Sequence, residues 1–192
     1  MKKVILSLCL LCTALTSWGQ ETTSAKLQKQ FKISYQILAF EASYELPISD
    51  AFSLEGGIGI GAGNYVRPTL LNSKELGAAL SFESFPPLRL RTKVKYVYNR
   101  EKRLKAGKNI AYNSGNYLAL QSLLTTAQRD DSDQKKPANN TLITEVHWGL
   151  QRSLGGNWLF NVYAGIGYAY DFHFQLGKIH PAIGLEFSYV LF

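Results

Sequence analysis

Residues 158–172 read WLFNVYAGIGYAYDF, and bulky apolar side chains alternate there with smaller or more polar ones. The first set of alternate positions is Trp158, Phe160, Val162, Ala164, Ile166, Tyr168, Tyr170 and Phe172. The second set is Leu159, Asn161, Tyr163, Gly165, Gly167, Ala169 and Asp171. Neighbouring side chains on a β-strand point to opposite faces, so this stretch predicts a long strand with one apolar, aromatic face.

The same period of two recurs through much of the chain, notably in residues 88–99, 142–151 and 183–191. On this basis we expect eight strands, near residues 31–36, 39–48, 52–65, 86–99, 115–125, 141–153, 157–171 and 181–192. Alternation without helical periodicity predicts an all-β fold, and an even number of antiparallel strands is typical of bacterial outer-membrane barrels.

The connections between these strands differ in length. Short turns are expected at 47–50 and 154–157, and long polar connections at 66–85 and 126–140. Outer-membrane barrels place short turns on the periplasmic side and long loops outside the cell. The connection 99–114 departs from this arrangement, because it is long and basic yet belongs to the periplasmic side.

The direction of the apolar face separates a membrane barrel from a soluble one. The interior of an eight-stranded barrel is just wide enough for its own side chains, so a face that carries Trp148, Trp158, Phe160 and Tyr168 must point outward. Outward aromatics near the strand ends would form the girdles at the membrane interfaces. The sequence therefore predicts an eight-stranded antiparallel up-and-down transmembrane β-barrel, in which every backbone group is paired.

The opposite face carries charges of both signs, and buried charges need partners. The expected interior set is Glu41, Glu45, Glu55, Arg89, Arg91, Lys93, Lys95, Glu145 and Glu186. We expect the glutamates of the second and third strands to lie beside the basic fourth strand, with glycines in 57–63 leaving room for the long side chains. This predicts a structural ion-pair network that fills the lumen, with a narrow proton or ion path as the alternative.

The first residues have the layout of a secretory signal: two lysines, an apolar run and then small residues. We expect cleavage after Gly19, which gives a signal peptide at 1–19 and an outer-membrane barrel domain at 20–192. Both cysteines, Cys9 and Cys12, lie in the signal, so the mature domain would have no thiol, and no cofactor is expected. The formal charge of +7 becomes about +5 once Lys2 and Lys3 are removed. The basic residues are not clustered with aromatic residues in the manner of nucleic-acid binding, so no nucleic-acid partner is expected.

Several segments resemble those of a known protein family, namely residues 96–103, 107–109, 113–118 and 44–54, together with the strand-rich C-terminal half. The chain resembles a family of small, porin-like outer-membrane β-barrel proteins that are abundant in Bacteroidetes-type bacteria and mostly lack an assigned activity. The resemblance implies an outer-membrane location, with membrane lipids and the barrel-assembly machinery as partners.

The last residue is similar to the C-terminal aromatic that the barrel-assembly machinery recognises. Phe192 is nevertheless one residue out of phase with the apolar set Phe187, Tyr189 and Leu191. Either a β-bulge turns Phe192 outward, or the assembly signal is weaker in this chain.

A basic cluster lies in the connection 99–114, and its members are Arg100, Lys102, Arg103, Lys105 and Lys108. Positive charge near a lipid surface attracts anionic headgroups. We therefore consider two interpretations: a solvated turn, and a surface that docks phospholipid headgroups, the cell wall or a periplasmic partner.

The remaining polar candidates favour structural interpretations. A hydrolase barrel would need one of His147, His173 and His180 beside a serine and a carboxylate. The segment 128–136 holds three aspartates but lacks the spacing of a calcium-binding loop. The glycines of 56–63 lie within a strand, where a phosphate-binding loop would not form. No metal site and no enzyme activity are predicted.

These observations lead to one expectation about function. The chain is expected to be a non-enzymatic barrel of the cell outer membrane with a structural, envelope-stabilising or surface-interaction role. The alternatives are a narrow channel for small solutes or ions, a lipid-modifying barrel enzyme, and a soluble periplasmic ligand-binding barrel.

Overall fold

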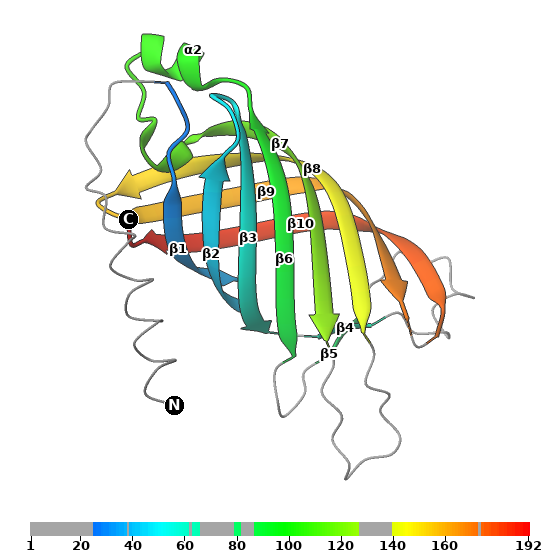
Figure 1. The fold of residues 1–192 in the computed structure, drawn as a ribbon. Helices are drawn as coiled ribbons and strands as arrows, with labels where there is room; N and C mark the ends of the chain where they lie inside the picture. Colours follow the sequence, from blue (N-terminus) through cyan, green and yellow to red (C-terminus); the bar gives the residue numbers. More distant parts are fainter. Residues whose placement is uncertain are drawn as a thin grey trace, which may run out of the picture.

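The computed structural model is a closed antiparallel β-barrel (Figure 1). It describes residues 25–37, 39–61, 63–65, 79–81, 87–126, 140–172 and 174–192. The barrel strands are β1 (Gln30–Gln36), β2 (Ala39–Pro47), β3 (Phe52–Gly61), β6 (Leu88–Val97), β7 (Gly115–Thr126), β8 (Thr141–Gly155), β9 (Trp158–Asp171) and β10 (Leu176–Val190). The expected eight-stranded, antiparallel, all-β fold is therefore confirmed.

Each barrel strand pairs with the barrel strands that precede and follow it along the chain, which makes an up-and-down meander. β1 closes the ring on β10, with a register that runs from Lys32 opposite Val190 to Gln36 opposite Glu186. Because the ring is closed, no strand of the barrel is left as an open edge along its whole length.

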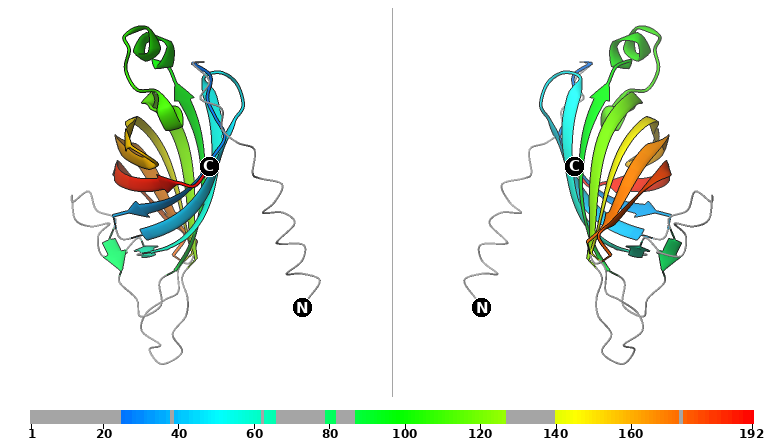
Figure 2. Two further views of the ribbon diagram at one scale, coloured as in Figure 1. Left: turned by 90° about the vertical axis from the view of Figure 1, so that its left-hand side faces the viewer. Right: turned by 90° about the vertical axis from the view of Figure 1, so that its right-hand side faces the viewer.

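The two ends of the barrel differ (Figures 1 and 2). One end, which we call the helical end, carries the turn at 48–51, the connection 98–114, the turn at 156–157 and the C-terminus. The connection 98–114 forms the helix α2 (Arg100–Lys105) and the 3-10 turn η2 (Ala111–Asn113), neither of which the strand periodicity predicted. The opposite end, the loop end, carries the β1–β2 turn and the connections from β3 to β6, β7 to β8 and β9 to β10.

The expected third strand, 52–65, is wrong at its far end. β3 stops at Gly61, and residues 63–65 form β4 (Gly63–Tyr65), which pairs with β5 (Ala79–Ser81) in a separate two-stranded sheet. The physical reason is the length of the neighbours. Ala39, the first residue of β2, is opposite Gly61, and Leu88, the first residue of β6, is opposite Ile60, so the described part of the barrel offers no strand partner beyond Gly61.

The expected start of the last strand at residue 181 is also wrong, because β10 begins at Leu176. Pro181 lies inside the strand, opposite Ile166. A proline interrupts a sheet least where one side of its strand is unpaired. The short strand β1 pairs only with 186–190 of β10, so Pro181 has β9 beside it and no partner on the other side.

The C-terminal residue is turned outward by a β-bulge, which is one of the two expected alternatives. The pairing of β10 with β1 and with β9 is regular up to Val190, where the strand ends. Beyond Val190, Leu191 N donates to Phe31 O at 2.8 Å and Phe31 N donates to Phe192 O at 2.9 Å, so two residues oppose Phe31. Phe192 follows the strand end, is exposed and stacks on Phe31, with ring centroids 5.8 Å apart. The phase difference noted in the sequence therefore arises because Leu191 and Phe192 both lie opposite Phe31 and are both exposed.

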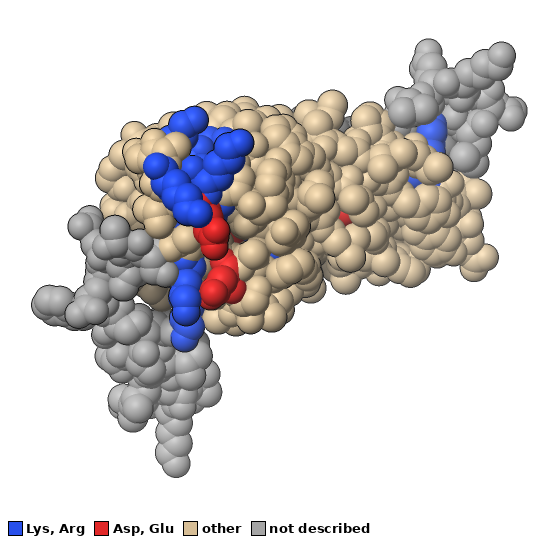
Figure 3. Space-filling view, turned by 90° about the horizontal axis from the view of Figure 1, so that it is seen from above, with Lys and Arg blue, Asp and Glu red and all other residues tan. Residues whose placement is uncertain are grey.

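Large apolar side chains cover the outer face of the strands. The exposed set includes Ile33, Tyr35, Phe40, Leu54, Ile58, Leu90, Tyr96, Leu118, Leu120, Val146, Trp148, Trp158, Ile166, Tyr168, Ile183, Phe187 and Tyr189. On the face seen in Figure 3, the wall between the ends carries almost no charge. The buried side chains of the same strands include charged and polar ones, so the barrel is polar inside and apolar outside.

Candidate functional site in the charged lumen and at the helical end

Charged side chains from five strands meet inside the barrel. Glu41 and Glu45 project from β2, Glu55 from β3, and Arg91, Lys93 and Lys95 from β6. Lys32 from β1 and Glu186 from β10 join them, and every side chain of this set is buried. Their inward direction follows from the period of two, because Leu90, Thr92, Val94 and Tyr96 occupy the outward positions of β6.

Arg91 is the centre of the first ion cluster. Its guanidinium donates to Glu41, to Glu55 Oε1 at 2.8 Å and to Glu186 Oε2 at 3.3 Å. In the ring order, β10 lies on the side of the barrel opposite to β6, so the contact with Glu186 spans the lumen. Arginine suits this position because its planar fork of donors serves several carboxylates at once.

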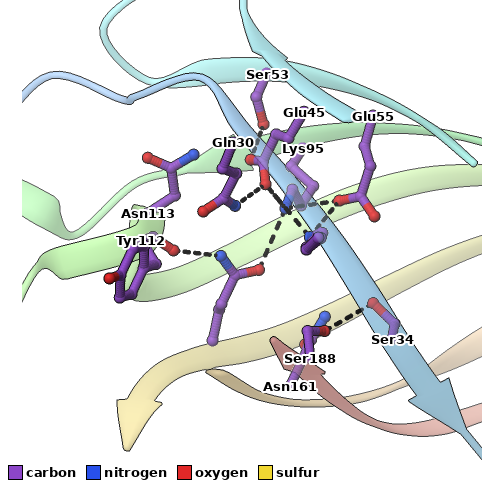
Figure 4. Close-up of polar contacts among 12 residues, drawn as sticks. Gln30, Ser34, Glu45, Ser53, Glu55, Lys95, Tyr112, Asn113, Asn161 and Ser188 are labelled. Atoms are coloured by element: carbon purple, nitrogen blue, oxygen red, sulfur yellow. Dashed lines mark hydrogen bonds and ion pairs between the residues drawn. The ribbon is translucent and has the colours of Figure 1, made fainter. Parts of the chain in front are cut away.

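A second ion cluster lies nearer the helical end, and Figure 4 shows its members. Lys95 Nζ lies 2.8 Å from Glu45 Oε2 and 3.0 Å from Glu55 Oε2. Lys32 Nζ approaches the same two carboxylates, at 3.5 Å and 3.0 Å. Two cations thus share two carboxylates, and the side chains of Lys32 and Glu45 are 0 % exposed, so water does not screen their attraction.

Uncharged polar groups complete this cluster. Gln30 donates to Glu45 Oε2, and Ser53 donates to Glu45 Oε1 at 2.7 Å. The amide oxygen of Gln151 accepts from Lys95 at 3.2 Å, while its amide nitrogen donates to the backbone oxygen of Tyr112 in η2 at 2.7 Å. The last bond connects the ion cluster inside the barrel with the cap at the helical end.

Lys32, Gln30 and Gln151 are not in the interior set that was expected from the sequence. The signal was present for Lys32, because Lys32, Ser34 and Gln36 alternate with Phe31, Ile33 and Tyr35 along β1. The first strand has only 7 residues, so its alternation is a weaker signal than that of the longer strands.

The remaining members of the expected interior set lie apart from the two ion clusters. Glu145 accepts from Gln121 at 2.8 Å and lies 4.0 Å from His180 Nε2. Arg89 is partly buried at the loop end of β6. Lys93 is fully buried, its Nζ has no hydrogen-bond partner among the described residues, and it lies 5.7 Å from the centre of the Tyr163 ring.

The glycines of β3 make room for an acid more directly than for the basic residues. A Cβ atom at Gly57 would collide with the carboxylate of Glu41, and one at Gly59 would collide with the backbone of Phe40 and Glu41. Glu41 therefore lies flat over these two glycines, and this position lets it reach Arg91. The expectation that the glycines accommodate arginine and lysine side chains is corrected in this respect.

The histidine expected inside the barrel contacts aromatic rings. His147 stacks on Tyr163 with ring centroids 4.1 Å apart and meets the edge of Tyr117 at 6.0 Å. Its two ring nitrogens have no hydrogen-bond partner among the described residues. His173 and the aspartates of 128–136 lie outside the described residues, as does the expected signal peptide.

At the helical end, Arg100 is separated from the rest of the expected basic cluster. It is buried, and its guanidinium donates to the backbone oxygens of Ala25 at 2.8 Å, Lys26 at 2.9 Å and Ile110 at 2.9 Å. Burial lowers the pKa of Arg100 from its ordinary value, although arginine stays charged at neutral pH. Its role is to hold the segment before β1 against α2 and η2.

The same segment, residues 25–29, has further contacts with the cap. The backbone N–H of Gln28 donates to Oδ1 of Asn113 in η2 at 2.8 Å, and Nδ2 of Asn113 donates to the backbone oxygen of Gln28 at 2.9 Å. Leu27 is buried in an apolar cluster with Val97, Tyr117 and Ala119. An apolar cluster therefore lies at the helical end, where the polar contact of Gln151 with Tyr112 also lies.

The other basic residues of the cluster are placed on the surface. Lys102, Lys105 and Lys108 are exposed, while Arg103 is partly buried and donates to the backbone oxygen of Asn109 at 2.7 Å. Figure 3 shows these cations as a patch at the helical end.

Comparisons of the chain with protein-family models, curated proteins and solved structures gave no match. Within the described residues, no helix is long and apolar enough to cross a bilayer, and no group of three His, Cys, Asp or Glu residues could hold a metal ion. The site is therefore interpreted from its own geometry: a lumen crossed by ion pairs and capped at the helical end.

Proposed function

We propose that this chain is a closed β-barrel of a bacterial outer membrane that acts through its surfaces, in a structural, envelope-stabilising or surface-interaction role. The observation that carries the proposal is the polarity of the barrel wall. Large apolar side chains face outward from every barrel strand, and Ile183 is 73 % exposed, whereas the charged side chains of the same strands are buried. Water-soluble proteins rarely expose a continuous apolar surface of this extent.

Aromatic side chains at the helical end support the membrane location. The exposed rings are Tyr96, Trp158 and Tyr189, near the ends of β6, β9 and β10 on that side, Tyr98 just after β6, and Trp148 in the middle of β8. Trp148 Nε1 donates to Tyr98 Oη at 2.9 Å, and Trp158 meets Tyr189 edge to face at 5.2 Å. Rings of this kind are enriched at the interface between hydrocarbon and water.

The lumen favours a closed barrel over a channel. The cluster at Arg91 connects β6 to β2, β3 and β10, and the cluster at Lys95 lies between it and the helical end. Leu27 and its apolar neighbours then lie under the cap. A hydrated ion would have to displace several buried ion pairs in order to pass, and each partner left alone would be costly.

The membrane location is tested by expressing the full chain and separating the envelope fractions. We expect the protein in the outer-membrane fraction, extractable by detergent and resistant to a carbonate wash. Unheated samples should migrate differently from boiled ones on a denaturing gel, because a closed barrel stays folded in the detergent until it is heated. Recovery of the protein in the soluble periplasmic fraction would overturn the proposal.

A further inference from the structure

Exposed cations gather on α2 and on the loop that follows it. Lys102, Lys105 and Lys108 are exposed, and the structure gives none of these three side chains an ion pair or a hydrogen bond within its described part. The only acid in the stretch 100–110 is Glu101. The nearby exposed acid, Asp50, pairs with Lys26 at 3.8 Å. The lysines of α2 therefore present positive charge that the protein itself does not neutralise.

The position of α2 sets the depth of these lysines. The outward rings of Tyr96 and Tyr98 are followed by Asn99, the N-cap of α2, and then by Arg100, the first residue of the helix. Tyr98 is fixed by its hydrogen bond from Trp148. In the membrane orientation proposed above, these aromatics lie at the headgroup level, so α2 begins where the hydrocarbon ends.

The helix is also held in place. Arg100 ties its first turn to the backbone of residues 25–26 and 110, and Arg103 ties its last turn to Asn109. The lysines are therefore presented from a fixed backbone. Figure 3 shows the cationic patch at one end of the barrel, next to the uncharged wall.

We propose that Lys102, Lys105 and Lys108 bind the anionic headgroups of phospholipids in the leaflet at the helical end. A lysine close to an anionic surface gains about a fivefold preference for it, and this attraction weakens as salt screens it. The inference rests on the proposed membrane location and adds the class of ligand. A headgroup is favoured over a cell-wall or protein partner because the lysines directly adjoin the interfacial aromatics.

The experiment uses Trp148 as the reporter of nearby lipids. The chain holds three tryptophans, so the substitutions Trp18→Phe and Trp158→Phe leave Trp148 as the single tryptophan. Trp148 is hydrogen-bonded to Tyr98, two residues before α2. The full chain is reconstituted in vesicles of phosphatidylcholine and phosphatidylglycerol. In one preparation the anionic phosphatidylglycerol carries brominated acyl chains, and in the other the neutral phosphatidylcholine does. The mole fraction of brominated lipid is the same in both. Brominated chains quench tryptophan fluorescence on contact, so the ratio of the two quenching values measures the enrichment of anionic lipid at this site.

We expect brominated phosphatidylglycerol to quench Trp148 more strongly than brominated phosphatidylcholine. The triple variant Lys102→Gln, Lys105→Gln, Lys108→Gln should lower this excess about twofold or more, and added salt should lower it in the unsubstituted chain. The matched control replaces the same three lysines by arginine and should keep the excess. Equal quenching by the two lipids, or an excess that the glutamine variant retains, would overturn the inference and favour another kind of partner for the patch.

Two further readings separate this inference from the proposed membrane location. The heat-dependent gel shift should be the same for the glutamine and arginine variants, because the three side chains are exposed and support no other residue. If neither brominated lipid quenched Trp148 in a folded chain, the barrel would not be inserted, and the membrane location would fail. Insertion with equal quenching would leave that location intact and remove only the headgroup site.

Discussion

At the scale of single residues, Arg91 and Lys93 form a matched pair of buried cations on one strand. Arg91 donates to Glu41, Glu55 and Glu186, whereas Lys93 Nζ has no hydrogen-bond partner among the described residues. Arg91→Met would leave buried carboxylates without their partner, which typically costs about 3 to 5 kcal/mol. Lys93→Met removes a buried cation that has no hydrogen bond to offset the cost of its burial. We therefore expect a much smaller loss of stability than for Arg91→Met.

Urea unfolding of the barrel in lipid vesicles, followed by tryptophan fluorescence, checks this pair. The midpoint for Arg91→Met should fall well below that of the unsubstituted chain, and the midpoint for Lys93→Met should stay near it. Equal shifts for the two variants would show that burial of a cation on β6 decides stability irrespective of its hydrogen bonds.

Gly57 and its neighbour Gly56 provide a second comparison of residues. A Cβ at Gly57 would occupy the place of the Glu41 carboxylate, whereas a Cβ at Gly56 would meet nothing within 4 Å. Gly57→Ala should push Glu41 away from Arg91 and destabilise the barrel by about 1 to 3 kcal/mol. Gly56→Ala should leave the urea midpoint near its original value or raise it slightly. A loss at position 56 as large as that at 57 would mean that the strand, and not the carboxylate, requires glycine.

At the scale of elements, the cap formed by α2 and η2 holds the segment before β1. Arg100 supplies three charge-assisted hydrogen bonds to backbone oxygens, and such bonds are worth about 1.5 to 3 kcal/mol each. Arg100→Met should therefore release residues 25–29 while the barrel stays folded. Hydrogen exchange measured on this segment should become at least about tenfold faster, since 1.4 kcal/mol corresponds to a factor of ten.

Arg103→Met is the matched control on the same helix. Arg103 bonds only to Asn109 among the described residues, within its own connection, so its loss should not change exchange in residues 25–29. If Arg100→Met left exchange in that segment unchanged, Leu27 and the Gln28–Asn113 pair would have to hold the segment without Arg100.

At the scale of the whole molecule, the sequence predicts the closed arrangement of the barrel strands better than the contacts between the side chains inside it. A period of two read over 158–172 is enough to orient a strand, and an interior with little room forces the large rings outward. Which charges meet depends on the stagger of the strands around the ring. The pairing of Arg91 with Glu186, from opposite walls, has no local signal in the sequence. Arg100 donates to backbone oxygens, which every residue has, so the types of its partner residues give no signal. The cap could therefore not be predicted from the sequence.

The closed lumen leads to a prediction for the intact barrel. Two groups of side chains are expected to act as barriers to an ion: the ion clusters around Arg91 and Lys95, and the apolar cluster of Leu27, Val97, Tyr117 and Ala119 at the helical end. We expect no steady conductance from the chain in planar bilayers, although insertion can be verified by the gel shift. Arg100→Met loosens only the apolar cluster at the helical end, so it should also stay closed.

Removing both barriers should behave differently. The combination of Arg91→Met with Arg100→Met takes away the cation that spans the lumen and the clamp on residues 25–29 together. If that double variant still folds, it should show brief openings that neither single variant shows, because each barrier alone is enough to exclude a hydrated ion. Steady conductance from the unsubstituted chain would contradict a closed barrel and favour the channel, while leaving the membrane location and the headgroup site untouched.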